Sequence, residues 1–95
     1  MAKIFKGQDF RLTLTGGIDI TDGSAKIQYF KPGSKTVTEK TATVSSATTA
    51  VCYYDFTSTD NDAVGMWVFW LKLTASDSKI YYGEPFKLGI HTPGN

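Results

Sequence analysis

The chain has 95 residues, enough for one domain with one core but not for a deep catalytic cleft as well. Ten Lys and Arg residues against nine Asp and Glu residues give a net charge of +1. The basic residues are spread from Lys3 to Lys87 without a run, whereas phosphate binding needs a concentrated basic surface. We therefore expect neither nucleic acid nor a membrane as partner.

The N-terminus and the cysteine content indicate in which cellular compartment the chain is expected. Residues 1–6 contain no long apolar run, so we expect neither a signal peptide nor a membrane span there. Cys52 is the single cysteine, which excludes an intrachain disulfide, and its apolar neighbours predict a buried, inert thiol. A fold without disulfides suits a reducing cytoplasm or a particle assembled in one.

Strands are predicted throughout, because apolar residues alternate and turn residues recur about every ten positions. Residues 35–49 are rich in Thr, Ser and Lys, which predicts one or two solvent-facing strands at a sheet edge. The expected strands in chain order are 1–6 as a short extra strand, 10–14, 25–30, the edge strands within 35–49, 50–56, 66–73, and 79–90 with an interruption at 83–85.

Two connections have specific signatures. Lys31-Pro32-Gly33-Ser34 predicts a type II turn, because proline sets φ at the second position and glycine accepts a positive φ at the third. Residues 57–65 predict a capped corner with a single helical turn, started by Ser58 or Thr59 and ended by Gly65. Residues 91–95 are expected to form a loose tail.

The strand at 66–73 is apolar on both faces. Side chains alternate with period two, so Trp67, Phe69, Leu71 and Leu73 share one face, which must be core. The opposite face should be wet, yet it carries Val68 and Trp70, and such a face on a small β domain marks a contact surface. The residues expected in the core are Trp67, Phe69, Leu71, Leu73, Ile27, Tyr29, Cys52, Tyr54 and Phe86.

This pattern predicts a single all-β domain over residues 1–95, an immunoglobulin-like antiparallel β-sandwich of about seven strands. The run Gly65-x-Trp67-x-Phe69 is similar to the Gly-x-Tyr-x-Cys run at one corner of immunoglobulin domains. By this similarity Trp67 takes the place of the corner tyrosine, and Phe69 takes the place of the second cysteine.

No constellation of residues predicts catalysis. The single histidine, His91, lies after the last strand, so no Ser-His-Asp or Cys-His arrangement can be built around it. Asp60 and Asp62 are not followed by the other ligands of a calcium-binding loop, so we expect them to stabilise a turn or cap a helix end instead. Glu84 is expected to point outward at a bulge. We therefore expect no catalytic residue, no cofactor site and no metal site.

Aromatic residues on outward-facing positions are the candidate binding residues. They favour a protein-binding patch, because Trp and Tyr are enriched at interface centres. Two alternatives remain open: a flat platform for stacking sugars, formed by Trp70, Tyr53 and Tyr81, or a face covered by residues 1–6 or by the tail. The candidate partner-binding residues are Val68, Trp70, Tyr53, Tyr81 and Phe30.

Several short motifs occur in an order that resembles a known family. They are Asp19-Ile-Thr-Asp-Gly23, the run from Ala25 to Gly33, Tyr54-x-Phe-Thr57, Ala63-x-Gly-x-Trp67, and the run from Tyr81 to Leu88. Over roughly residues 18–90 this order resembles the N-terminal immunoglobulin-like domain of phage baseplate upper proteins and related small phage virion proteins.

The resemblance implies a bacteriophage virion structural protein without enzyme activity, located in the virion after assembly in the host cytoplasm. It would dock on other virion proteins of the tail, baseplate or connector, in repeated copies of a symmetric assembly, with self-association as a further option. Baseplate upper proteins carry long C-terminal extensions, whereas this sequence stops at Asn95, which favours an accessory protein on the capsid surface or tail. The alternative function is a carbohydrate-binding or host-surface adhesion module.

Overall fold

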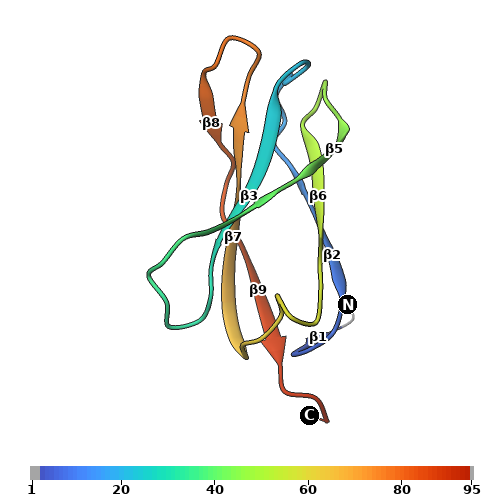
Figure 1. Cartoon of the computed structure of the whole chain (residues 1–95), viewed down its shortest axis with the longest axis vertical. Helices are drawn as coiled ribbons and strands as arrows, with labels where there is room; N and C mark the ends of the chain where they lie inside the picture. The colour runs from blue at the N-terminus through green and yellow to red at the C-terminus, as the bar shows by residue number, and fades with distance from the viewer. Residues whose placement is uncertain (1–2, 95) are drawn as a thin grey trace.

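The computed structural model describes residues 3–94, and this range contains nine strands and no helix (Figure 1). The prediction of an all-β chain is therefore confirmed. Met1 and Ala2 of the expected first strand, and Asn95 of the expected tail, lie outside the described residues. The strands are β1 (Ile4–Phe5), β2 (Phe10–Thr15), β3 (Ser24–Phe30), β4 (Thr38–Thr41), β5 (Thr43–Ser46), β6 (Val51–Phe56), β7 (Gly65–Thr74), β8 (Ile80–Tyr82) and β9 (Phe86–His91).

Two sheets form a sandwich around one core (Figure 1). The large sheet has the order β1-β9-β7-β3-β4, with β8 also pairing with β7, and the small sheet has the order β2-β6-β5. Neighbouring strands are antiparallel except β1 and β9, which are parallel. The coarse prediction of a β-sandwich is thus confirmed.

The polar stretch at 35–49 forms two edge strands, as its composition predicts. β4 pairs with β3 at the edge of the large sheet, and β5 pairs with β6 at the edge of the small sheet. Ala42 lies between them, is 8% exposed, and donates its N–H to the carbonyl of Ala25. One nearly continuous segment therefore crosses from one sheet to the other and closes that side of the core.

Alternation along β7 divides core from surface. Trp67, Phe69, Leu71 and Leu73 are each at most 2% exposed. Ile27, Tyr29 and Cys52 are buried with them, and Tyr54 is half-buried against the same cluster.

Phe86 corrects the expected core list, because it is 41% exposed. It lies opposite Phe69 in the β7–β9 register, so its side chain has the inward direction. The small sheet has three strands against six, and its strand β2 packs over β7. The inward direction of a side chain at the wider sheet's margin is therefore not enough to bury it.

The predicted type II turn is confirmed. Gly33 has φ of 73°, and the N–H of Ser34 donates to the carbonyl of Lys31 at 3.0 Å. A residue with a Cβ would be strained at the third turn position, because φ is positive there.

The corner before β7 contains the predicted single helical turn, because the N–H of Asn61 donates to the carbonyl of Thr57 at 3.0 Å, but the predicted capping residue is wrong. Thr57, rather than Ser58 or Thr59, is the capping residue: its hydroxyl accepts the N–H of Asp60, and the carboxylate of Asp60 accepts the N–H of Thr57 at 3.1 Å. Gly65 ends the corner with φ of 133°, and a Cβ there would lie 2.8 Å from Pro32.

Asn61 is the anchor of this corner, a role that the sequence pattern did not indicate. It is 1% exposed, and its side-chain amide donates to the carbonyls of Phe5 at 2.7 Å and Gln8 at 2.9 Å. The main-chain carbonyl of Asn61 accepts the N–H of Gly7 at 2.9 Å. Asn61 therefore ties the β1–β2 connection to the corner between β6 and β7, at the same end of the sandwich (Figure 1).

Candidate functional site

The outer face of the large sheet is the most unusual surface of the molecule. It consists of the side chains on β3, β4, β7, β8 and β9 that point away from the small sheet. The strand register places Phe30 opposite Val68, and Gln28 opposite Trp70. The large apolar side chains on this face are Phe30, Met66, Val68, Trp70, Ile80 and Tyr82.

Phe30 and Trp70 form the centre of this face. Their ring centroids lie 5.1 Å apart, and the ring planes are tilted by 53°. Both side chains are half-buried. Contact between adjacent strands therefore shields part of the apolar surface, and the rest stays available.

A chain of hydrogen bonds across three strands holds Trp70 in place. The indole N–H of Trp70 donates to Oε1 of Gln28 at 2.9 Å, and Nε2 of Gln28 donates to Oε1 of Glu39 at 3.1 Å. Nζ of Lys26 lies 3.4 Å from the other oxygen of Glu39. The hydrogen bond from Gln28, with the nearby lysine charge, holds the pKa of Glu39 below its usual value. The rotamer of Trp70 is thus fixed before any partner arrives.

Exposed apolar side chains lie at both ends of the face. Met66, at the start of β7, is 56% exposed. Ile80 and Tyr82, on β8, are 51% and 64% exposed. Tyr82 lies opposite Lys72 and Ile80 opposite Thr74, so both point to the outer face.

The charged groups on this face are mostly basic. Lys26 and Lys72 lie opposite each other on β3 and β7, and Lys87 lies opposite Val68. Glu39 on β4 is the carboxylate among them. The apolar centre is therefore bordered by three ammonium groups and one carboxylate.

The outer face of the small sheet is more polar than that of the large sheet. Thr and Ser provide half of its outward side chains and charged residues two more, which is the usual solvated surface of a sandwich. Its aromatic residue, Tyr53, lies beneath the guanidinium of Arg11, with the Arg11 carbon 4.0 Å from the ring centroid. Arg11 also makes two hydrogen bonds to Asp55, at 2.7 and 3.1 Å. Tyr53 is thus already covered by side chains of its own sheet.

Three of the five predicted binding residues lie together, and two do not. Val68, Trp70 and Phe30 share the outer face of the large sheet. Tyr53 lies on the small sheet, on the opposite side of the sandwich. Tyr81 lies opposite Leu73 and so has the inward direction, at the margin where it is 44% exposed.

This separation removes the sugar platform that Trp70, Tyr53 and Tyr81 were expected to form. Residues 3–6, the described part of the N-terminal segment, do not cover the face as the other alternative required. β1 extends the large sheet sideways beyond β9 instead of crossing its outer face (Figure 1).

Groups with catalytic or metal-binding chemistry do not converge in residues 3–94. No three His, Cys, Asp or Glu side chains in that range lie close enough to hold a metal ion. Burial raises the pKa of the Cys52 thiol, which disfavours the reactive thiolate. The same range contains no helix long and apolar enough to cross a bilayer.

Comparison with known proteins gives a fold likeness. No family model and no curated protein sequence matches the chain. Among solved structures, CopC from Methylosinus trichosporium OB3b is similar, with a TM-score of 0.58 and 21% identity, over 100% of this chain and 84% of that chain. At this identity the likeness concerns the fold alone.

This comparison overturns one prediction. The expected role as a bacteriophage virion structural protein is wrong, because the structure that is similar over the whole chain is a CopC and not a virion protein. What the comparison supports is a β-sandwich.

Proposed function

We propose that this chain is a protein-binding β-sandwich module that docks a partner on the outer face of the large sheet. The observation that carries the proposal is the contrast between the two outer faces. One is Thr- and Ser-rich with its tyrosine covered, whereas the other presents Phe30, Val68, Trp70 and three exposed apolar side chains. Contiguous exposed apolar surface with fixed aromatic anchors is typical of interaction sites.

The charges favour an acidic partner over a second copy of the chain. Two such faces brought together would place six ammonium groups against two carboxylates, and like charges in a forming interface are unfavourable. A partner with an apolar centre and an acidic border complements Lys26, Lys72 and Lys87. Attraction of this kind mainly raises the association rate and weakens with added salt.

We also propose that the sandwich is of the immunoglobulin-like kind. Three features support this assignment: the order β1-β9-β7-β3-β4 facing β2-β6-β5, the parallel pairing of β1 with β9, and the segment that changes sheets between β4 and β5. A fourth feature is the corner, where the indole N–H of Trp67 donates to the carbonyl of Ala63 at 3.0 Å. This bond is the counterpart of the tyrosine corner in immunoglobulin domains.

Site-specific photocrosslinking in an extract of the native source tests the binding proposal. A benzophenone side chain is placed at Tyr82 on the proposed face, and at Thr43 on the small sheet as the matched control; both positions are exposed. We expect a discrete adduct with an acidic protein from the Tyr82 probe and none from the Thr43 probe. Met66→Glu should abolish the adduct by opposing the partner's charge, whereas Ser45→Glu should leave it unchanged.

Sedimentation velocity of the purified chain separates the two kinds of partner. A monomer at about 0.15 M salt, where screening acts over roughly 8 Å, is the expected result. A dimer that Met66→Glu dissociates would assign the face to self-association instead. Equal adducts from both crosslinking probes would remove the proposed function altogether.

A further inference from the structure

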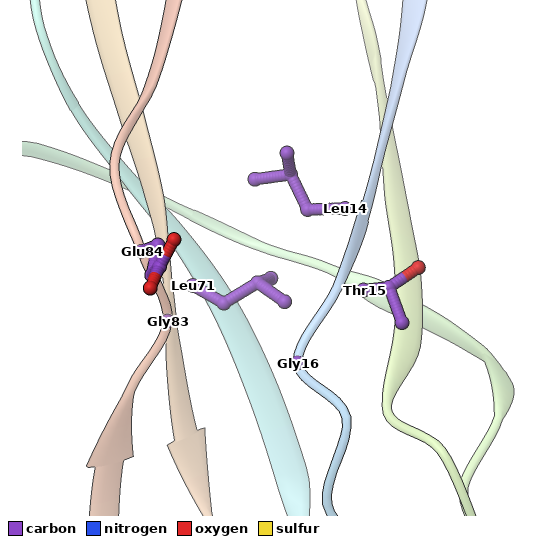
Figure 2. Close-up of a pocket in the computed structure, with 6 residues that line it drawn as sticks. All are labelled: Leu14, Thr15, Gly16, Leu71, Gly83 and Glu84. Atoms are coloured by element: carbon purple, nitrogen blue, oxygen red, sulfur yellow. The ribbon is translucent and has the colours of Figure 1, made fainter.

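We infer that the molecule has a second, separate recognition site, which takes an extended peptide bearing a lysine or arginine side chain. The site combines the free edge of β2 with a groove between the two sheets (Figure 2). It lies on the side of the sandwich opposite the segment that crosses from β4 to β5, and shares no residue with the proposed docking face.

The backbone of β2 is ready to pair with another strand. β2 is the last strand of the small sheet on this side, and no described residue pairs with its free edge. The N–H of Gly16 donates to the carbonyl of Ala50, which continues the β2–β6 ladder. Hydrogen-bonded positions alternate in such a ladder, so Arg11, Thr13 and Thr15 direct their N–H and C=O groups to the free edge. An added strand therefore finds three residues in register for hydrogen bonding.

The groove beside this edge is a cavity of about 310 Å³. Leu71, a core residue 2% exposed, forms part of its floor, and Leu14 from β2 faces it from the other sheet (Figure 2). Gly16 and Gly83 line the groove on either side, and neither has a side chain that would fill it. The groove exists because the ladder between β7 and its neighbour is interrupted between β8 and β9, where Pro85 has no N–H to donate.

One charge decides which side chain fits. Glu84 lines the groove, is exposed, and has no ion-pair partner among residues 3–94. The methylene stem of a lysine or arginine can lie along Leu14 and Leu71 while its cationic head reaches the carboxylate. In an added strand this residue lies opposite Leu14, because side chains at that position point inward while their backbone groups point away from β2.

Two synthetic peptides test the site, acetylated and amidated heptapeptides of alternating Thr and Val. One has Lys in place of the central Val, and the other has neutral norleucine there. Titration into the ¹⁵N-labelled protein should shift the amide signals of Arg11, Thr13, Thr15 and Glu84. The Lys peptide should bind about two- to fivefold more tightly than the norleucine peptide, as expected for a partly exposed ion pair.

Two modifications identify the contacts without endangering the fold. N-methylation of the Thr residues of the peptide removes the donors that face β2 and should abolish binding, whereas N-methylation of the Val residues should have little effect. Glu84→Gln should remove the preference for Lys over norleucine, while Asp77→Asn, at an exposed turn, should preserve it. Shifts confined to the outer face of the large sheet, or equal effects of the two N-methylation patterns, would overturn the inference.

Discussion

The two tryptophans of β7 provide a direct test of how the strand divides core from surface. Trp67 is 1% exposed, donates to the carbonyl of Ala63 at 3.0 Å, and packs against Tyr29 and Phe69. Trp70, three residues later, is half-buried on the outer face, where water can replace its bond to Gln28. Each is changed to Phe, which keeps an aromatic ring and leaves the other tryptophan as fluorescent probe.

The expected cost of Trp67→Phe follows from two losses. The buried hydrogen bond contributes about 1 kcal/mol, and its loss leaves the carbonyl of Ala63 without this donor. Phe is smaller than Trp by roughly 40 Å³, which at about 24 cal/mol per Å³ of cavity adds about 1 kcal/mol. The free energy of unfolding should therefore fall by about 2 kcal/mol. For Trp70→Phe we expect a decrease below about 0.5 kcal/mol, the usual range of surface substitutions.

Urea denaturation followed by circular dichroism measures both values. With a slope of about 1 kcal/mol per M for a chain of this size, the Trp67→Phe midpoint should fall by about 2 M and the Trp70→Phe midpoint by less than about 0.5 M. Equal shifts for the two variants would refute the division of β7 into a core face and a binding face. A changed slope would mean that the unfolded state, rather than the native packing, is affected.

Three further predictions concern the corner and the core margin. Asn61→Ala should lower the free energy of unfolding by about 1–3 kcal/mol, because the carbonyls of Phe5 and Gln8 lose their donor in two part-buried hydrogen bonds, and faster hydrogen exchange at the Lys6 amide should report release of β1. Burial raises the pKa of the Asp60 carboxyl, but the N–H of Thr57 and the ammonium of Lys40 at 3.1 Å outweigh it and hold the pKa below its usual value. The stability contributed by Asp60 is thus complete above about pH 4 and is lost as the pH falls through the lower folded pKa; Asp60→Asn should flatten this part of the stability curve in urea titrations at pH 2 to 6. Phe86→Ala should cost less than about 1 kcal/mol whereas Phe69→Ala should cost about 3–5 kcal/mol in the same assay, and similar costs would show that the margin is packed like the core.

The fold could be predicted largely from alternation and turn chemistry. Period-two patterning identified the inward face of β7, and the Pro32-Gly33 pair identified its turn, since both signals depend on local backbone geometry. The corner was predicted less well. The Thr-rich loop offers several capping residues, and the Thr57-x-x-Asp60 spacing, whose side chains and backbone N–H groups bond reciprocally, is the local signal that would have chosen Thr57. The anchor Asn61 depends on contacts with Phe5 and Gln8, which are more than fifty positions away.

The misplacement of Tyr81 has a precise geometric origin in the strand pairing. Lys72 lies opposite Tyr82 and Phe69 lies opposite Phe86, so three steps along β7 correspond to four steps along the facing segment. The extra residue is a bulge at 83–85, and a one-residue slip moves every side chain to the other face. Sequence alternation counted from Phe86 therefore assigns Tyr81 to the wrong face. Tyr53 was misplaced for another reason: alternation tells which side of its own strand a residue takes, but not which sheet that strand joins.

The same bulge connects the two proposed sites. By shifting the register it turns Tyr82 and Ile80 to the outer face of the large sheet, where they extend the apolar surface around Trp70. By interrupting the ladder it leaves the groove beside Leu71 open and places Glu84 on its border. A strand without the bulge would close the groove and would direct the aromatic residues of β8 to the opposite face. Deleting Glu84 alone should therefore impair crosslinking from the docking face as well as peptide binding, whereas Glu84→Gln should impair only peptide binding. Loss of one activity alone in the deletion variant would show that the two sites do not share this origin.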